Sequence, residues 1–301
     1  MGNDQESFPD HYSFSQRYGY EPLPKAMALG ELSKEFRREA CNVFESFAKS
    51  FATNSQFGWY FRNAGSQLFA SIIGEFEGVP DYEVDANFKL VMAKVHDIIK
   101  NDRFDRVLHF LEILLRQTRI AEDYFQRLQF ATKIQALLQK HNAAYRLSIE
   151  YNHRFWFFPC ESEEHAVAVA QALELLQQGE FEGAKAHLRH AVDHINGGRH
   201  AAAIAESIHA VESVARKIDP KASKSLSPAL KSLQDRGLLT HDALCKAFEK
   251  LYGYTSNEQG IRHALIDKDA ANVDVAESVF MFGACASFAG YLVRKQHVGR
   301  R

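Results

Sequence analysis

Apolar residues recur every three or four positions along most of this chain, and that spacing limits the fold more than any other feature. It is the period of an α-helix, so each such stretch would present one apolar face. In the first half the spacing predicts helices over residues 36–51, 59–73, 88–99, 107–115 and 124–138. In the second half it predicts helices over residues 166–176, 181–195, 204–218, 227–235, 240–251 and 274–295. Because each helix must bury its apolar face against others, we predict an all-α fold.

The period changes between residues 145 and 158. Tyr145, Leu147, Ile149 and Tyr151 alternate with polar residues, and an apolar run over residues 155–158 follows. Such alternation is typical of a half-buried strand, so we predict a small β-hairpin that leans on the helices. The break after this hairpin is the expected domain boundary. The prediction is an N-terminal helical domain over residues 1–160, ending in the hairpin, and a C-terminal helical bundle over residues 161–301.

Two aromatic segments near the N-terminus are expected to pack against the first domain. Residues 13–24 include Tyr18, Tyr20 and two prolines, and the prolines exclude a helix interior. We therefore expect an ordered arm laid on the domain by its rings. The run Trp59-Tyr60-Phe61 could be a binding surface, but rings of this kind more often fill a core, and core packing is the prediction.

Composition and charge exclude several classes of protein. A net charge of −2 over 301 residues provides no global basic field, so any RNA contact must be a local patch. The four cysteines are far apart and form no C-x-x-C pair, which indicates a reducing compartment and argues against a zinc knuckle. The sequence has no P-loop, G-x-S-x-G or H-E-x-x-H motif. No apolar run approaches a membrane span and no signal-peptide pattern is present, so we expect a cytoplasmic protein that needs no membrane and no cofactor.

The segment over residues 251–267 is the strongest candidate for chemistry. Thr255 and Glu258 have the spacing of a capping box, which predicts a helix beginning near Ser256. A helix N-terminus carries partial positive charge and free N–H donors, so it favours an anion.

Three residues in this predicted helix could handle a phosphodiester. Gly260 has no side chain, so a ligand can come close to the backbone. Arg262 offers a planar fork of donors suited to phosphate, and His263 can exchange a proton near neutral pH. The alternative is an ordinary helix start with two exposed basic residues, because short motifs match often.

Three histidines form a second constellation. His187, His190 and His194 stand at i, i+3 and i+7, on one side of a predicted helix. That spacing can serve metal ligands. The sequence shows no acidic partner for them, so we expect a solvated face and no metal site. In the last predicted helix, small residues over positions 283–290 permit close approach, either in the bundle core or in a dimer interface.

Two stretches of the second half resemble HEPN domains, the all-α bundles of prokaryotic toxin and phage-defence proteins. They are HLRHAVDHINGGRHAAAIAESIHAVESVARKI, from residue 187, and LYGYTSNEQGIRHALID, from residue 251. The first half, from SFSQRYGY onward, is similar to the N-terminal domain of AbiJ-type abortive-infection proteins.

This resemblance implies a homodimeric, metal-independent endoribonuclease. Such nucleases place an Arg, then four to six residues, then a His in a dimer cleft. Carried over, Arg262 would hold the scissile phosphate and His263 would help to activate the RNA 2′-OH, although the two residues are adjacent here. Glu212 occupies the place of a polar residue on an early bundle helix and would orient them; its alternative is an exposed glutamate.

The function expected from these features is that of an anti-phage toxin that cleaves RNA, tRNA being one candidate, after a phage-derived trigger. The alternative is a non-catalytic sensor or scaffold of the same fold that binds nucleic acid or a phage protein. The irregular spacing of Arg262 and His263 is the feature that favours the alternative.

Overall fold

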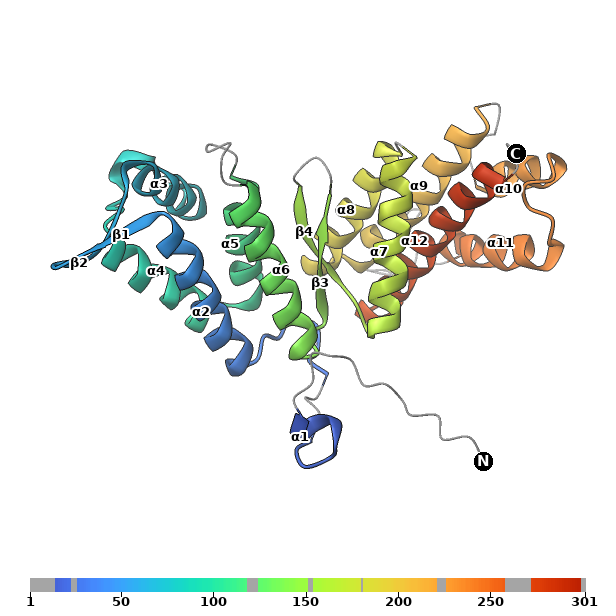
Figure 1. The fold of residues 1–301 in the computed structure, drawn as a ribbon. Coiled ribbons are helices and arrows are strands. Elements are labelled where there is room, and N and C mark those ends of the chain that lie inside the picture. Colours follow the sequence, from blue (N-terminus) through green and yellow to red (C-terminus); the bar gives the residue numbers. More distant parts are fainter. Residues whose placement is uncertain are drawn as a thin grey trace. The chain divides into compact units, whose positions relative to one another are not determined.

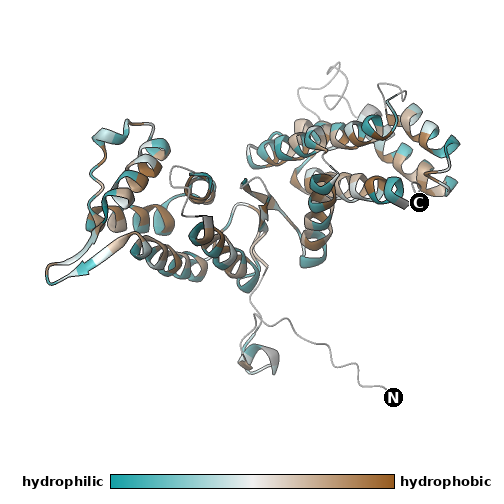
Figure 2. Ribbon diagram, turned by 45° about the horizontal axis from the view of Figure 1, so that its top comes forward, coloured by the Kyte–Doolittle hydropathy of each residue, from teal (hydrophilic) through white to brown (hydrophobic). Residues whose placement is uncertain are grey.

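The computed structural model describes residues 14–22, 26–117, 124–150, 154–179, 181–220, 226–257 and 272–298. Within these ranges the elements are helices and two small antiparallel hairpins, which confirms the predicted all-α fold with a minor β component. Figure 2 shows hydrophilic and hydrophobic residues alternating along the helices, as the spacing in the sequence predicts. The chain divides into two compact units, Met1–Phe158 and Pro159–Arg301.

The first unit contains amphipathic helices and both hairpins (Figure 1). Its second helix begins after an N-cap at Ser33, whose hydroxyl accepts a 3.0 Å hydrogen bond from the N–H of Phe36. In chain order the elements are α1 (Phe14–Arg17), α2 (Lys34–Ser50), β1 (Ala52–Ser55), β2 (Gly58–Phe61), α3 (Asn63–Glu77), the 3₁₀ turn η1 (Asp81–Glu83), α4 (Phe88–Asn101), α5 (Phe104–Arg116), α6 (Tyr124–Lys140), β3 (Tyr145–Ile149) and β4 (Phe155–Pro159).

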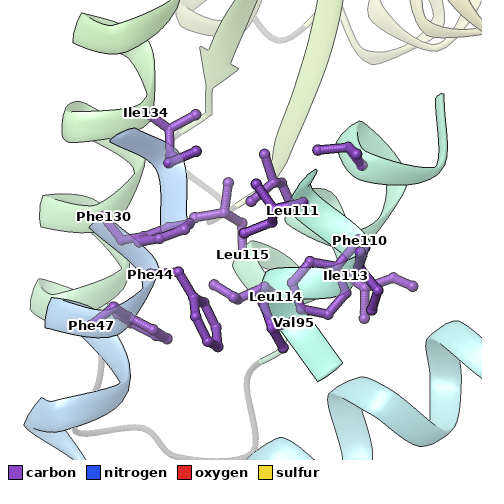
Figure 3. Close-up of a cluster of buried hydrophobic side chains, with 14 of the residues drawn as sticks. Phe44, Phe47, Val95, Phe110, Leu111, Ile113, Leu114, Leu115, Phe130 and Ile134 are labelled. Atoms are coloured by element: carbon purple, nitrogen blue, oxygen red, sulfur yellow. The ribbon is translucent and has the colours of Figure 1, made fainter. Parts of the chain in front are cut away.

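Aromatic rings from four helices fill the core of the first unit, and Figure 3 shows those of α2, α5 and α6. Phe44 of α2 meets Phe69 of α3 and Phe110 of α5 edge to face, with ring centroids 5.8 and 6.3 Å apart. Phe47, one turn further along α2, lies 5.0 Å from Phe130 of α6. These five rings are buried, so the apolar faces predicted from the sequence meet in one core.

Residues 52–61 form a hairpin, so the prediction of a helix beginning at Trp59 is wrong. β1 pairs with β2 in antiparallel register, with Ser55 opposite Gly58. Gly58 has a φ of +105°, which suits a tight turn and not a helix. Trp59 and Tyr60 are 40% and 51% exposed, and only Phe61 is buried. The predicted core packing is therefore correct for one ring of the three, because a two-stranded sheet leaves much of its surface open.

The aromatic arm differs from its prediction. Residues 14–17 form the single-turn helix α1, which ends before the prolines. Phe14, Tyr18 and Tyr20 are all more than half exposed, so they do not anchor the arm in a core. Their rings contact one another instead, with Phe14 lying 4.6 Å from Tyr18 and 6.3 Å from Tyr20. Residues 1–13 lie outside the described part of the chain.

The hairpin predicted over residues 145–158 is present as β3 and β4. Near its turn the N–H of Glu150 donates to the carbonyl of Arg154 at 2.9 Å. Every residue of β4 is buried. The N–H of Phe157 donates to the Glu112 carboxylate of α5 at 2.9 Å. The helices therefore supply the burial and partners that two isolated strands lack.

The second unit is a helical bundle (Figure 1). Its helices are α7 (Glu163–Gln178), α8 (Glu182–Asn196), α9 (His200–Ile218), α10 (Leu226–Asp235), α11 (Asp242–Asn257) and α12 (Val275–Val298). α8 and α9 form an αα-hairpin joined by residues 197–199, with Gly198 at a φ of +68°. Such a short connection makes the two helices antiparallel neighbours.

The small residues of α12 lie along its seam with α7. A Cβ placed on Gly283 would lie 2.1 Å from Nε2 of His165, and one on Gly290 would lie 3.0 Å from Cα of Ala172. Of the two roles left open by the sequence, these glycines therefore serve the bundle core. In the described residues α12 is also the one helix long and apolar enough to cross a membrane, so the expectation that no apolar run approaches a membrane span is wrong for this helix. Core packing accounts for its composition, because 61% of its apolar window is buried in the fold.

α11 runs past Thr255, so the predicted helix start near Ser256 is wrong. Thr255 is fully buried, and its hydroxyl donates to the carbonyl of Tyr252 at 2.7 Å. A threonine hydroxyl can bond to a carbonyl one turn back inside a helix. The residue that looked like a cap is therefore part of the last turn of the preceding helix.

Candidate functional site

The α8–α9 hairpin brings two pairs of polar residues face to face. His187 and His190 stand one turn apart on α8, and Glu206 and His209 stand one turn apart on α9. Because the hairpin turns at Gly198, residues equally distant from it along the chain lie opposite each other. His187 therefore faces His209, with ring centroids 5.4 Å apart, and His190 faces Glu206.

The Glu206 carboxylate is the centre of this cluster. Its Oε2 lies 2.7 Å from Nδ1 of His187 and 3.7 Å from Nδ1 of His190, and its Oε1 lies 3.8 Å from Nδ1 of His209. Burial by itself would raise the pKa of Glu206. The hydrogen bond with His187 and the neighbouring imidazoles outweigh that effect, so the pKa lies below the usual glutamate value. Glu206 is therefore ionised at neutral pH.

A pocket of about 570 Å³ continues from this cluster along α9. His187 and His209 line one part of it. Four of the other lining residues follow on one side of α9 and include two cations, and the fifth, Pro220, lies just beyond its end. The five are Glu212, Ser213, Arg216, Lys217 and Pro220. The pocket therefore combines groups that can exchange protons with groups that can bind an anion.

One residue that lines the pocket contains a buried acceptor without a partner in the described part of the chain. The Oε1 atom of Glu212 is buried and has no hydrogen-bond partner among the described residues. A buried acceptor without a partner costs free energy, so it is a place where a donor from a ligand would bind favourably. On α8, Gly183 lies opposite Ser213, and an added Cβ would come within 2.8 Å of its hydroxyl oxygen. Glycine at this position therefore lets α8 and α9 approach closely at Ser213.

Of the four site residues predicted from the sequence, only Glu212 lies in the part of the chain that the structure describes. Glu212 lies in the pocket, partly buried, and is not the exposed glutamate of the alternative. Gly260, Arg262 and His263 lie outside the described residues. The three-histidine face is also divided: His187 and His190 contact Glu206, whereas Nδ1 of His194 accepts a 2.8 Å hydrogen bond from Nε of Arg199.

The acidic partner of these histidines is Glu206, which lies on the next helix. The spacing of residues along α8 alone does not reveal it, because the partner depends on how α8 pairs with α9. The signal was present, because two glycines at positions 197 and 198 separate two amphipathic helices. Folding the sequence about Gly198 places Glu206 opposite His190 and His209 opposite His187.

These observations define an all-α protein whose second unit contains a histidine-lined pocket. The chain matches the AbiJ N-terminal domain 4 family over residues 12–173, and it belongs to that family. The predicted resemblance of the first half to AbiJ-type proteins is thereby confirmed, and it connects the chain to abortive infection. No curated protein and no solved structure matched the chain. The HEPN resemblance of the second half stays a prediction.

Proposed function

We propose that this chain is the RNA-cleaving component of an abortive-infection system. It would act as a cytoplasmic homodimer, cleave RNA (tRNA being one candidate) without a metal cofactor and need no membrane. A phage-derived trigger would release its activity. The observation that carries the proposal is the α8–α9 pocket, where two imidazoles and two cationic side chains line one space. These are the groups that phosphodiester cleavage by an internal nucleophile requires.

The chemistry can be written from the pocket residues. One imidazole, His187 or His209, takes the proton of the RNA 2′-OH, and the 2′-oxygen forms a bond to phosphorus. The bond from phosphorus to the 5′-oxygen breaks, and the other imidazole, in its protonated form, gives its proton to that oxygen. The products are a 2′,3′-cyclic phosphate and a 5′-hydroxyl. Arg216 and Lys217 would stabilise the charge that develops on the phosphate.

Glu206 gives one imidazole a defined orientation. Its 2.7 Å hydrogen bond to Nδ1 of His187 favours the tautomer that carries a proton on Nδ1. Nε2 is then left with a lone pair and can accept a proton. A carboxylate that holds a histidine in this way is the orienting partner of many acid–base pairs.

The sequence assigns the same roles to a second set of residues. In that assignment Arg262 holds the phosphate, His263 transfers the proton, Gly260 admits the RNA and Glu212 orients the pair. Both assignments place Glu212 at the site, and both predict the same products. Variants of the two sets therefore distinguish them.

The test measures cleavage of total RNA by the purified full chain in the presence of EDTA. We expect fragments that end in a 2′,3′-cyclic phosphate. His209→Gln or Arg216→Gln should lower the rate at least about 100-fold if the pocket is the site, within the range for loss of a general acid–base group. Arg262→Ala or His263→Ala should do so if the motif is the site. His241→Gln is the matched control, because His241 is exposed and does not line the pocket.

A parallel experiment expresses the parent and the inactive variants in a bacterial host, with and without phage challenge. Growth arrest with RNA fragmentation by the parent alone supports the proposal. If the parent binds RNA and protects cells but no RNA is cleaved, the nuclease proposal is refuted. The sensor or scaffold function then takes its place.

A further inference from the structure

We propose that His187, His190, Glu206 and His209 form a binding site for a divalent transition metal of the zinc class. The inference goes beyond the proposed function: the metal site shares His187, Glu206 and His209 with the proposed cleavage mechanism, but its ion takes no part in cleavage. Three imidazoles and one carboxylate make a ligand set without thiolates. Imidazole and carboxylate together suit Zn²⁺, Co²⁺ and Ni²⁺ better than Mg²⁺ or Ca²⁺, which prefer oxygen ligands.

The arrangement of the four residues on two facing helices supports this assignment. α8 contributes a His-x-x-His pair and α9 contributes a Glu-x-x-His pair. Residues at i and i+3 point to the same face of a helix, so each pair presents two ligands to the same space. Helical bundles build metal sites from such pairs on facing helices. The turn at Gly198 sets the register that brings the two pairs together.

The distances between the ligand atoms are short enough for the side chains to bind one ion together. The ligand atoms of His187, His190 and Glu206 lie within 4.8 Å of one another. Ligands about 2.0–2.1 Å from a tetrahedral zinc ion are separated by about 3.4 Å. The 3.7 Å between His190 and Glu206 is close to that value. The 2.7 Å contact of His187 with Glu206 is a hydrogen bond, and a metal ion would replace its proton.

Accessibility and charge also favour a metal. The side chains of His187 and His190 are 36% and 61% exposed, so an ion can enter from solvent. Glu206 is only 22% exposed and carries a negative charge at neutral pH, because its pKa is lowered. His209, one turn from Glu206 on α9, lies 3.8 Å from its Oε1 and would supply the fourth ligand.

The test uses full-length protein freed of metal with a chelator and then dialysed. Zn²⁺ is titrated in by calorimetry, and Co²⁺ is added separately, because its visible spectrum reports tetrahedral coordination. We expect saturable binding of one ion per chain. No RNA is present, so the result is independent of the proposed function.

Matched variants locate the ion. His190→Ala and the nearly isosteric Glu206→Gln should each weaken Zn²⁺ binding at least about tenfold. His194→Ala is the control, because His194 is on the same helix but bonds to Arg199 and should leave affinity unchanged. Circular dichroism checks that each variant folds. Absence of saturable binding by the parent, or equal loss in His194→Ala, would overturn the assignment.

Discussion

Replacing Gly283 with alanine tests how α12 packs on α7. A Cβ at this position would lie 2.1 Å from Nε2 and 2.7 Å from Cδ2 of His165. Ordinary contacts between non-bonded heavy atoms are at least about 3.5 Å, so the ring would have to retreat by about 1.4 Å. The ring is held, because its Nδ1 accepts a 3.3 Å hydrogen bond from the N–H of Glu161.

Two opposing terms set the size of the effect. Overpacking of a core typically costs about 1–3 kcal/mol. Alanine in a helix interior is favoured over glycine by about 1 kcal/mol. We therefore expect Gly283→Ala to lower the free energy of unfolding by about 1 kcal/mol, with an upper limit of about 2 kcal/mol. In a His165→Ala background the clash is absent, and the same substitution should stabilise the protein by about 1 kcal/mol.

The assay is urea unfolding followed by far-UV circular dichroism, which detects the helices of both units. Fluorescence is unsuitable, because both tryptophans, Trp59 and Trp156, lie in the first unit. Gly253→Ala on α11 is the matched control: an added Cβ there meets nothing within 4 Å, so this change should be stabilising. If Gly283→Ala stabilises the parent as much as Gly253→Ala does, the described seam is refuted.

Three further predictions concern pH, a helix cap and metal. Burial lowers the pKa of His96, His141 and His165 in the folded protein. At a pH between these lowered pKa values and about 6.5, the unfolded chain therefore binds more protons than the folded protein does. The free energy of unfolding should therefore fall as pH is lowered from about 7 to 5.5; a constant value in urea titrations would contradict this. Ser33→Ala removes the cap of α2 and should cost about 1 kcal/mol in the same assay, whereas Ser33→Asp should cost less. If RNA cleavage uses His187, Zn²⁺ should inhibit it and EDTA should restore it; activity unaffected by saturating Zn²⁺ would show that the ion and the proton transfer do not share this residue.

The helices could be predicted because their apolar residues repeat at the helical period. The apolar face of α2 and the β3–β4 hairpin are where the sequence places them. The aromatic run at Trp59 was misassigned, because three consecutive rings fit a strand as well as the start of a helix. Thr255 was misassigned for a related reason, since the same hydroxyl can cap a helix or bond back within one.

The candidate site also has one part that the sequence predicts and another that only the tertiary structure reveals. The sequence by itself determined the all-α fold and the stripe of histidines on one helix, and it singled out Glu212 as a candidate site residue. Only the tertiary structure decided that His187 and His190 share Glu206 and that a pocket continues past Glu212. The physical reason is that periodicity reports which residues share a face of one helix. The partner of that face depends on how two helices pack, and here the turn at Gly198 sets that register.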